Sequence, residues 1–445
     1  MARLARLAAL LFAVAAPVAA WAQSTAFVHV NVVPMDSERV LRDQTVLVRD
    51  GRIEAVGAAL AAPVGYQVID GHGTAWLSPG LADMHTHSET RNDLALYLAN
   101  GVTTLLNMGG ARANLVDSIV PAVARGSLPG PHVYASLMVD GTPDYNGLQI
   151  KTAAQARSVV DLASANGYDF IKVYVGLAPD VFSALADAGR AQGLPLVGHG
   201  VTAVRLERQL AQGQVLVAHL EEFFYTYFTP AGVQETDAPP DEARIPEAVA
   251  LARRYGAAVI ADIVTYQALA GQMGHPERLR AILAEPQTAY VAPADVQAWR
   301  RSGYGAKSAR LEAKLAFLRK LAKALADGGV ELLSGTDAPT IPGVAPGYSL
   351  HDNLAELERS SLSRYQTLVT ATRAPGAFIA RTKGGMGFGQ VVAGYRADLV
   401  LTEHNPLEGL ATLRAPLGVM AEGRWRDRQS LAALLEGVRA SYRPE

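Results

Sequence analysis

The chain has 445 residues, a formal net charge of −2 and no cysteine, and 49% of its residues are hydrophobic. This length allows one large core with a small satellite domain, and the near-neutral charge excludes a strongly basic surface for nucleic acid or anionic membranes. Without cysteine, disulfides, thiolate ligands and cysteine nucleophiles are excluded, so any bound metal has to be held by histidine, carboxylate or a modified lysine.

The first residues have the pattern of a secretory signal peptide, which we place at 1–22. Two arginines precede a short apolar run at 7–15, and residues 20–22 form a small-x-small cleavage site. We therefore expect export to the periplasm or the medium, with a mature chain that begins near Gln23. An uncleaved membrane anchor is the alternative, but a span requires about 20 apolar residues. We expect no stable membrane span after cleavage.

Both ends of the mature chain are predicted to be rich in short strands. Residues 23–78 contain β-branched runs and the hairpin signal Asp50-Gly51. Residues 388–430 repeat this pattern, with the turn Glu422-Gly423. We expect these two segments to form one small β-sandwich domain, and residues 431–445 to form a C-terminal helix or tail.

The middle of the chain, residues 79–387, alternates strand and helix patterns, which indicates an α/β fold. The eight candidate strands lie at 80–87, 102–107, 132–138, 170–175, 196–199, 216–220, 258–264 and 331–336. Eight alternating units of this kind predict a closed (β/α)₈ TIM barrel. A doubly wound open sheet is the structural alternative.

Two connections after the predicted strands are long, at 221–246 and at 266–329. The loops that follow the strands carry the chemistry in barrel enzymes. The first connection is aromatic, and its Tyr225 and Tyr227 are candidate substrate contacts. The alternative is that these rings only pack the loop against the protein.

Four histidines and an aspartate follow or end predicted strands. His85 and His87 are two residues apart in the first strand, so both imidazoles point to the same side. His199 and His219 end the fifth and sixth strands, 20 residues apart. Asp337 follows the eighth strand, which lies beside the first in a closed barrel. Taken singly, each of these residues could be structural.

Lys172 lies in an apolar run that reads as a buried strand. Lysine is almost never fully buried without a partner. One solution is reaction with CO₂, because the resulting carbamate is an anion with two oxygens that suit two cations. The alternative is a lysine at the strand end that meets an acid or solvent. Nitrogen and oxygen donors from five strands would then converge at one face of the barrel, as a hydrolytic Zn²⁺ site requires.

The combination of these motifs resembles the amidohydrolase superfamily, specifically its imidazolonepropionase-like and metal-dependent dipeptidase (prolidase-like) branch. The resemblance covers nearly all of the mature chain and rests on residues 78–87, the Lys172 strand, the two later histidines, residues 335–338 and residues 393–400. It is specific to the superfamily and much less specific to the substrate.

The resemblance implies two divalent metal ions, with Zn²⁺ the expected metal. His85, His87 and Asp337 would bind the more buried ion, and His199 and His219 the second. Carbamylated Lys172 would bridge them. Asp337 would also be catalytic, moving a proton from the metal-activated hydroxide to the leaving amine.

The chain departs from relatives in two segments. It has Glu221 and Glu222 after His219, where relatives often have a glutamate before this histidine, and residues 140–145 lack a histidine that many relatives carry. Substrate recognition is therefore expected to differ. His351 matches a segment common in the branch, where it either touches the substrate or caps the helix that follows.

The leading hypothesis is an exported binuclear amidohydrolase that cleaves an amide or peptide-like C–N bond of a small molecule. A dipeptide such as Xaa-Pro or an N-acyl amino acid would suit an exported scavenger. Lactone, ester or phosphotriester hydrolysis on the same metals is the enzymatic alternative, and a non-catalytic periplasmic binding protein is the alternative from another class. The oligomeric state is left open, and a homo-oligomer is compatible with the sequence.

Overall fold

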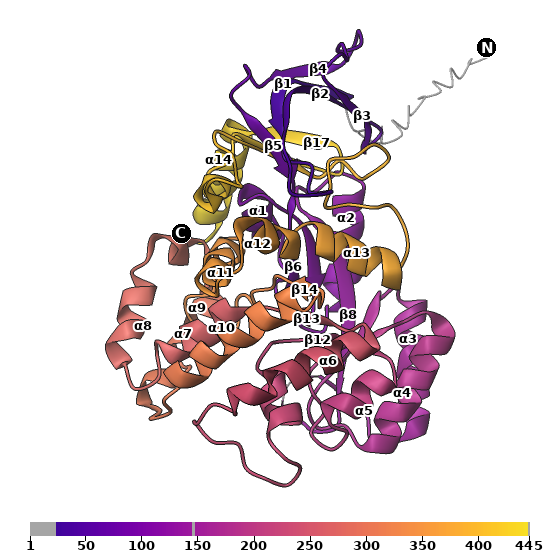
Figure 1. The fold of residues 1–445 in the computed structure, drawn as a ribbon, viewed down its shortest axis with the longest axis vertical. Coiled ribbons are helices and arrows are strands. Elements are labelled where there is room, and N and C mark those ends of the chain that lie inside the picture. The colour runs from indigo at the N-terminus through magenta and orange to yellow at the C-terminus, as the bar shows by residue number, and fades with distance from the viewer. Residues whose placement is uncertain (1–23, 145–146, 444–445) are drawn as a thin grey trace, which may run out of the picture.

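The computed structural model describes residues 24–144 and 147–443. The predicted signal peptide lies outside these residues. Figure 1 shows two layers, an upper sheet built from the first and last parts of the chain and a larger lower body built from the middle. None of the helices in the described residues combines the length and apolar character needed to cross a membrane.

The lower body is a barrel of parallel strands. The order in its sheet is β14-β13-β12-β11-β10-β8-β7-β6, and the short strand β9 (Leu148–Gln149) pairs with β8 at the side. The barrel strands are β6 (Leu81–Thr86), β7 (Val102–Asn107), β8 (His132–Asp140), β10 (Phe170–Val173), β11 (Leu196–Gly198), β12 (Gln214–Val217), β13 (Ala258–Ile260) and β14 (Leu332–Leu333).

The sheet closes between β6 and β14. The amide of Met84 donates to the carbonyl of Ser334 at 2.8 Å, and Thr86 forms a parallel bridge with Ala338. Closure distinguishes a barrel from a doubly wound open sheet, so the predicted TIM barrel is confirmed and the alternative is excluded. Each of the eight strands overlaps the segment predicted for it.

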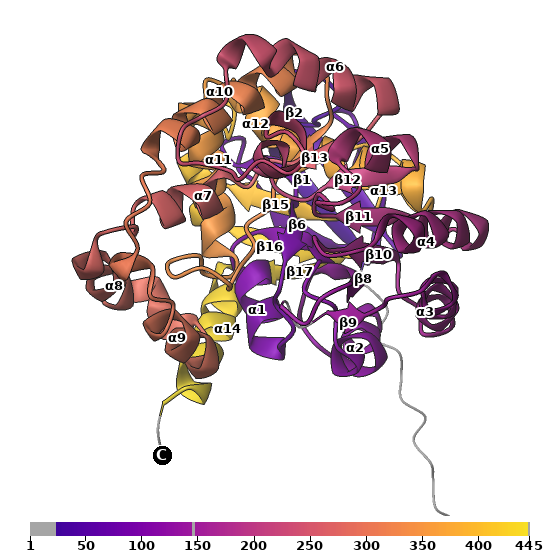
Figure 2. The same cartoon turned by 90° about the horizontal axis from the view of Figure 1, so that it is seen from below.

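Helices surround the barrel in the view along its axis (Figure 2). Local signals set their ends. The Thr152 and Gln155 side chains form a reciprocal capping box at the start of α3, and Gly193 ends α4 in the left-handed conformation. The helices are α1 (Arg91–Ala99), η1 (Leu115–Ile119), α2 (Val120–Ala124), α3 (Ala153–Ala165), α4 (Pro179–Gln192), α5 (Leu206–Ala211), α6 (Ile245–Tyr255), α11 (Tyr348–Arg359), α12 (Arg364–Thr370) and α13 (Arg373–Thr382).

The two long connections differ in structure. The first, after β12, contains only the short helices η2 (Phe224–Phe228) and η3 (Glu242–Arg244) before α6. The second is helical, as predicted, and consists of α7 (Ile263–Ala270), α8 (Pro276–Leu283), η4 (Pro286–Tyr290), α9 (Pro293–Arg300), η5 (Tyr304–Ala306) and α10 (Glu312–Asp327). Strand β13 ends at Ile260 rather than at the predicted residue 264, because α7 already begins at Ile263.

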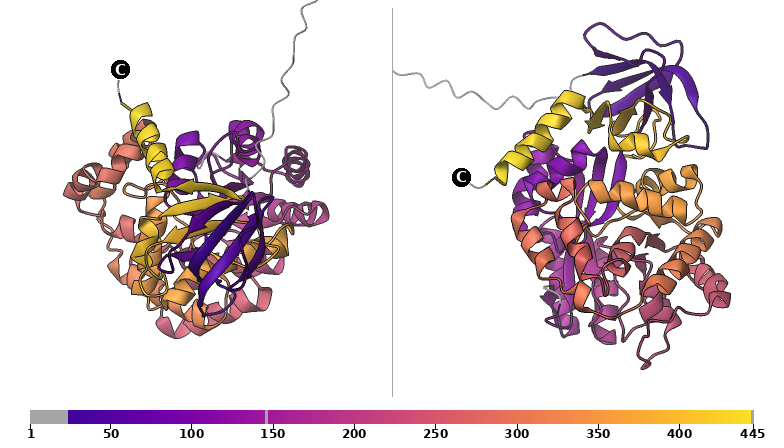
Figure 3. Two further views of the ribbon diagram at one scale, coloured as in Figure 1. Left: turned by 90° about the horizontal axis from the view of Figure 1, so that it is seen from above. Right: turned by 90° about the vertical axis from the view of Figure 1, so that its left-hand side faces the viewer.

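The upper sheet joins both chain ends (Figure 3). Its order is β17-β16-β15-β5-β1-β2-β3, with β4 paired to β1. The strands are β1 (Thr25–Val32), β2 (Leu41–Arg49), β3 (Arg52–Gly57), β4 (Gln67–Asp70), β5 (Trp76–Pro79), β15 (Leu399–Thr402), β16 (Gly418–Ala421) and β17 (Arg424–Asp427). The short helix η6 (Leu410–Arg414) lies between β15 and β16, and α14 (Arg428–Ser441) follows β17. Both residues of the Asp50-Gly51 turn have positive φ, as this hairpin type requires.

The barrel interior is filled by apolar side chains below the mouth. Met84, Leu106, Phe170 and Val197 belong to one buried cluster that also includes Phe378 of α13. Because side chains two residues apart in a strand share a face, the inward position of Phe170 places Lys172 inward as well, one layer closer to the mouth. The polar side chains therefore lie at the mouth of the barrel, and the apolar cluster fills the interior beneath them.

Candidate metal centre

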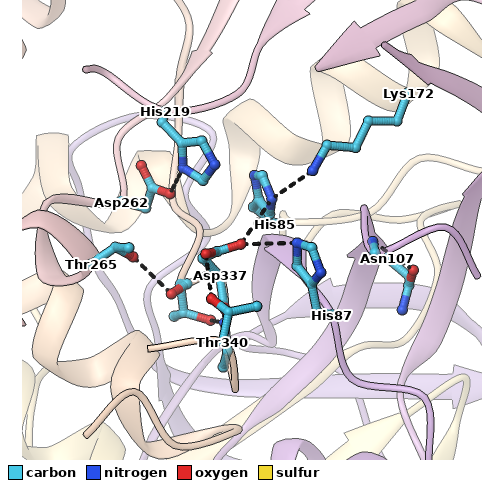
Figure 4. Close-up of polar contacts among 12 residues, drawn as sticks. His85, His87, Asn107, Lys172, His219, Asp262, Thr265, Asp337 and Thr340 are labelled. Atoms are coloured by element: carbon cyan, nitrogen blue, oxygen red, sulfur yellow. Dashed lines mark hydrogen bonds and ion pairs between the residues drawn. The ribbon is translucent and has the colours of Figure 1, made fainter. Parts of the chain in front are cut away.

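His85 and His87 face Asp337 across the closure of the barrel. The Oδ1 atom of Asp337 lies 3.2 Å from Nε2 of His85 and 3.0 Å from Nε2 of His87 (Figure 4). Burial alone would raise the pKa of the Asp337 carboxyl, but the facing imidazoles hold it well below its usual value. Asp337 therefore presents a carboxylate oxygen to two imidazole nitrogens at once.

The backbone around Asp337 is constrained to aim this carboxylate. Asp337 has a φ of 58°, in the left-handed region that non-glycine residues rarely occupy. Its amide donates to the His85 carbonyl at 2.8 Å, and its Oδ2 accepts a 2.5 Å hydrogen bond from Oγ1 of Thr340. Such strain is common at functional sites, where surrounding contacts hold it in place.

Lys172 is completely buried on β10, as the sequence predicted. Its Nζ lies 3.3 Å from Nε2 of His85, and it forms no ion pair with a carboxylate in the described part of the chain. Burial lowers the pKa of Lys172 to about 8. The lowered pKa increases the fraction of neutral amine, which is the form that reacts with CO₂.

His199 and His219 complete the wall of the site. Their ring centroids are 4.9 Å apart, and the His219 ring lies 4.3 Å from that of His85. The pKa of His199 is well below its usual value because of burial and the neighbouring Lys172. Burial opposes protonation of His219 too, but Asp262 raises the pKa of His219 to about 10. The structure thus brings together all six residues that the sequence singled out.

These residues fit divalent cations. Two groups have ligand atoms that all lie within 4.8 Å of one another, His85 with His87 and Asp337, and His85 with His219 and Asp262. The Nδ1 atom of His85 and the Oδ1 atom of Asp262 are buried without a hydrogen-bond partner among the described residues. Unsatisfied buried polar atoms are costly, and nitrogen and oxygen donors of this kind suit Zn²⁺ or a similar ion.

Sequence reasoning missed two carboxylates in the site. Glu222 and Asp262 are buried and hydrogen bond to Nδ1 of His199 and His219, respectively. The position of Asp262 just after β13 was a usable signal, because Asp337 was recognised from the same position after β14. Glu222 gave no such signal, since it reaches back from the loop after β12 to a histidine of the preceding strand.

The three candidate substrate contacts have different positions. Tyr225 is 39% exposed, whereas Tyr227 packs against Phe223 and beneath the guanidinium of Arg244. His351 is buried inside α11, where Nε2 donates to the carbonyl of Asn100 at 2.9 Å. The structure does not bring His351 to the centre. Its capping role is also wrong, because α11 begins after Gly347 with no side-chain cap.

A cavity of about 900 Å³ opens beside the centre. The residues that line it include His87, Thr340, the Gly109-Gly110 pair, Arg112 and Asp295. This volume lies within the range of small-molecule sites, about 300–1,000 Å³. The polar cluster therefore borders a space that can hold a substrate.

Comparison with solved structures identifies the architecture. Bottromycin amidohydrolase matches 95% of this chain and 92% of its own chain, with a TM-score of 0.75 and 24% identity. The chain has an amidohydrolase fold. A Xaa-Pro dipeptidase solved with bound methionine in the active site gives a TM-score of 0.69 over 91% of this chain and 100% of its own, at 16% identity. Both amidohydrolase-fold structures span the barrel and the upper sheet together.

Sequence comparison with curated proteins gives shorter matches. An imidazolonepropionase of Cupriavidus pinatubonensis is 41% identical over 70 residues, which are 14% of this chain and 16% of the relative. Adenine deaminase 2 of a Bradyrhizobium strain is 28% identical over 183 residues, 37% of this chain and 30% of the relative. The chain thus spans well under two thirds of these relatives. No protein-family model matches. The predicted resemblance to the amidohydrolase superfamily is confirmed.

Proposed function

We propose that this protein is an exported, metal-dependent hydrolase that cleaves an amide or peptide-like C–N bond of a small molecule. The observation that carries the proposal is the convergence of four histidines and Asp337 around the buried amine of Lys172, at the edge of a cavity of about 900 Å³. The amidohydrolase and dipeptidase names of the structural neighbours support the choice of C–N bonds.

The residues present would hold two divalent ions, with Zn²⁺ our first choice. His85, His87 and Asp337 would hold one ion and His199 and His219 the other. Lys172 would react with CO₂, so that a bond forms between Nζ and the carbon, the amine loses a proton and a bridging carbamate results. Two bound ions would lower the pKa of water and polarise the scissile carbonyl.

Asp337 is the candidate general base and acid. Its carboxyl pKa is held low, so it is ionised near neutral pH. In the proposed reaction, Oδ2 of Asp337 takes a proton from the attacking water as the new C–O bond forms. The same atom then gives the proton to the amine nitrogen as the C–N bond breaks. The hydrogen bond from Thr340 keeps this oxygen oriented.

The cavity supports a substrate that carries a carboxylate. Apart from His87, Arg112 is the one basic residue among the described residues that line it. Glu89 accepts from Nε of Arg112 at 2.5 Å, and the two terminal nitrogens of Arg112 form no hydrogen bond within the described residues. A guanidinium held in this way can bind a carboxylate through two donors. A dipeptide such as Xaa-Pro or an N-acyl amino acid presents such a group.

The proposal is tested by metal analysis and activity screening of zinc- or manganese-reconstituted protein. We expect close to two ions per chain and turnover of members of a panel of dipeptides and N-acyl amino acids. Turnover of lactones or phosphotriesters alone would contradict the preference for C–N bonds. Tight retention of panel compounds without turnover would instead favour a binding protein. N-terminal sequencing of exported protein, expected to begin near Gln23, tests export.

A further inference from the structure

Two buried carboxylates beside the centre lack the partners that buried acids usually have. Glu222 is 2% exposed and Asp262 is 1% exposed, yet neither forms an ion pair with lysine or arginine within the described residues. A buried carboxylate is costly unless it is paired and hydrogen bonded. The positive charge that compensates these two acids therefore has to lie on the side chains that they contact, or on a cation that those side chains bind.

Those contacts are imidazoles that face the candidate metal centre. Nδ1 of His199 donates to Oε1 of Glu222 at 2.5 Å, and Nδ1 of His219 donates to Oδ2 of Asp262. Because each histidine uses Nδ1 in this way, Nε2 is the nitrogen left to bind a cation. The second oxygen of Glu222 accepts from the amide of Gly200 at 2.9 Å, which fixes the carboxylate itself.

The pairs follow one rule around the barrel. Glu222 comes from the loop after β12 and holds the histidine that follows β11, whereas Asp262 follows β13 and holds the histidine that follows β12. Each imidazole is thus fixed by a carboxylate from the next strand. Figure 4 shows the Asp262–His219 pair directed toward the ring of His85.

We propose that Glu222 and Asp262 are positioning residues for metal binding, which accept the Nδ1–H of His199 and His219 and present Nε2 of both to the second ion. This inference rests on the proposed function. Two divalent ions would meet only two anionic ligands, Asp337 and the Lys172 carbamate. Glu222 and Asp262 place two further negative charges one imidazole away, and such partners typically change metal affinity about 10–100-fold.

For Asp262, the alternative is that the carboxylate serves only to stabilise the fold. The contacts of Asp262 argue against this, because its Oδ1 has no hydrogen-bond partner among the described residues. A carboxylate that served only as a structural link would gain by pairing both oxygens. Asp262 instead has His219 as its one side-chain hydrogen-bond partner among the described residues, and so orients that ring.

The test compares Glu222→Gln and Asp262→Asn with wild-type protein. Each variant keeps an amide oxygen that can accept the Nδ1–H bond but loses the negative charge. Asp140→Asn is the matched control, since Asp140 is also buried at the mouth of the barrel but bonds to Gly141, Gly176 and Thr142 rather than to histidine. Zn²⁺ affinity is measured by competition with a chelator, and Co²⁺ absorption reports the ligand geometry.

We expect the second Zn²⁺ to bind about 10–100-fold more weakly in Glu222→Gln and Asp262→Asn, with altered Co²⁺ spectra, and to bind unchanged in Asp140→Asn. Affinities within twofold of wild type in both variants would overturn the inference. If the affinities are unchanged in this way but the wild type turns over substrate, the inference fails and the proposed function is still supported. Conversely, weakened binding in the variants without any turnover by the wild type contradicts the proposed function alone.

Nitrogen-15 NMR of histidine-labelled wild-type protein tests the inference without any variant, so it does not depend on whether a variant folds. Addition of Zn²⁺ is expected to shift Nε2 of His199 and His219, while both Nδ1 atoms keep their protons. A metal-induced shift at Nδ1 with loss of its proton would overturn the inference, because the carboxylates would then have been displaced.

Discussion

The two halves of the candidate centre are built differently. In the half formed by β6 and β14, His85 and His87 contact the Asp337 carboxylate directly. In the half formed by β11 and β12, His199 and His219 each contact a separate carboxylate through Nδ1. The first half therefore shares one anion between two rings, and the second half assigns one anion to each ring. The difference means that the two halves should respond differently to loss of a single carboxylate.

The largest effect is expected where both halves meet. Lys172→Ala removes the amine beside His85 and hence the proposed carbamate bridge. We expect loss of most activity, with the metal content reduced to about one ion or less per chain. Steady-state kinetics and metal analysis are the measurements. Full activity of this variant without added small carboxylates would contradict the bridging role.

Asp337→Asn tests the half that shares its anion. The change removes the charge that two imidazoles face and the proposed proton carrier at once. Loss of general acid–base catalysis typically costs about 10²–10⁴-fold in rate, so we expect a fall in kcat of at least that size with a smaller change in KM. A fall below tenfold in metal-loaded protein would assign the proton transfer to another group.

Gly109→Ala tests the packing of the same half. A Cβ at this position would lie 2.8 Å from Nδ1 of His87, closer than real side-chain contacts allow. We expect His87 to shift, with activity lowered more than tenfold and weaker binding of the first ion. Gly409→Ala is the control, because nothing lies within 4 Å of its added Cβ. Equal activity of both variants would show that His87 tolerates the displacement.

The two halves of the centre also differ in how far the sequence predicts them. His85, His87 and Asp337 lie in short local motifs at the ends of predicted strands, so their convergence follows from barrel closure alone. Glu222 pairs with a histidine 23 positions earlier in the chain. That pairing depends on the path of the loop after β12, where His219 has a φ of 79°, and no local pattern records it.

The same limit explains the errors. The fold class and all eight barrel strands were predictable because hydrophobic periodicity repeats along the chain. His351 and Tyr227 could not be placed, because their directions depend on what packs against them. Asn100 faces His351 from the end of α1, and Arg244 covers Tyr227 from the start of α6. Sequence separation and residue type did not distinguish these side chains from substrate contacts.

The smallest effect is expected at the cavity wall. Arg112→Gln removes the cation proposed to bind the substrate carboxylate, and a charged hydrogen bond contributes about 1.5–3 kcal/mol. We therefore expect KM to rise at least tenfold for carboxylate substrates, with little change for the matching substrates whose carboxylate is amidated. Equal effects on both substrate series would show that Arg112 does not read this group.

A crystal structure grown with excess Zn²⁺ and bicarbonate tests the central claim most directly. The account predicts two ions at the mouth of the barrel, held by His85, His87, His199, His219 and Asp337, with a carbamate on Nζ of Lys172 between them. An unmodified Lys172 bonded to an ordinary carboxylate, in a centre that binds no zinc, would contradict it.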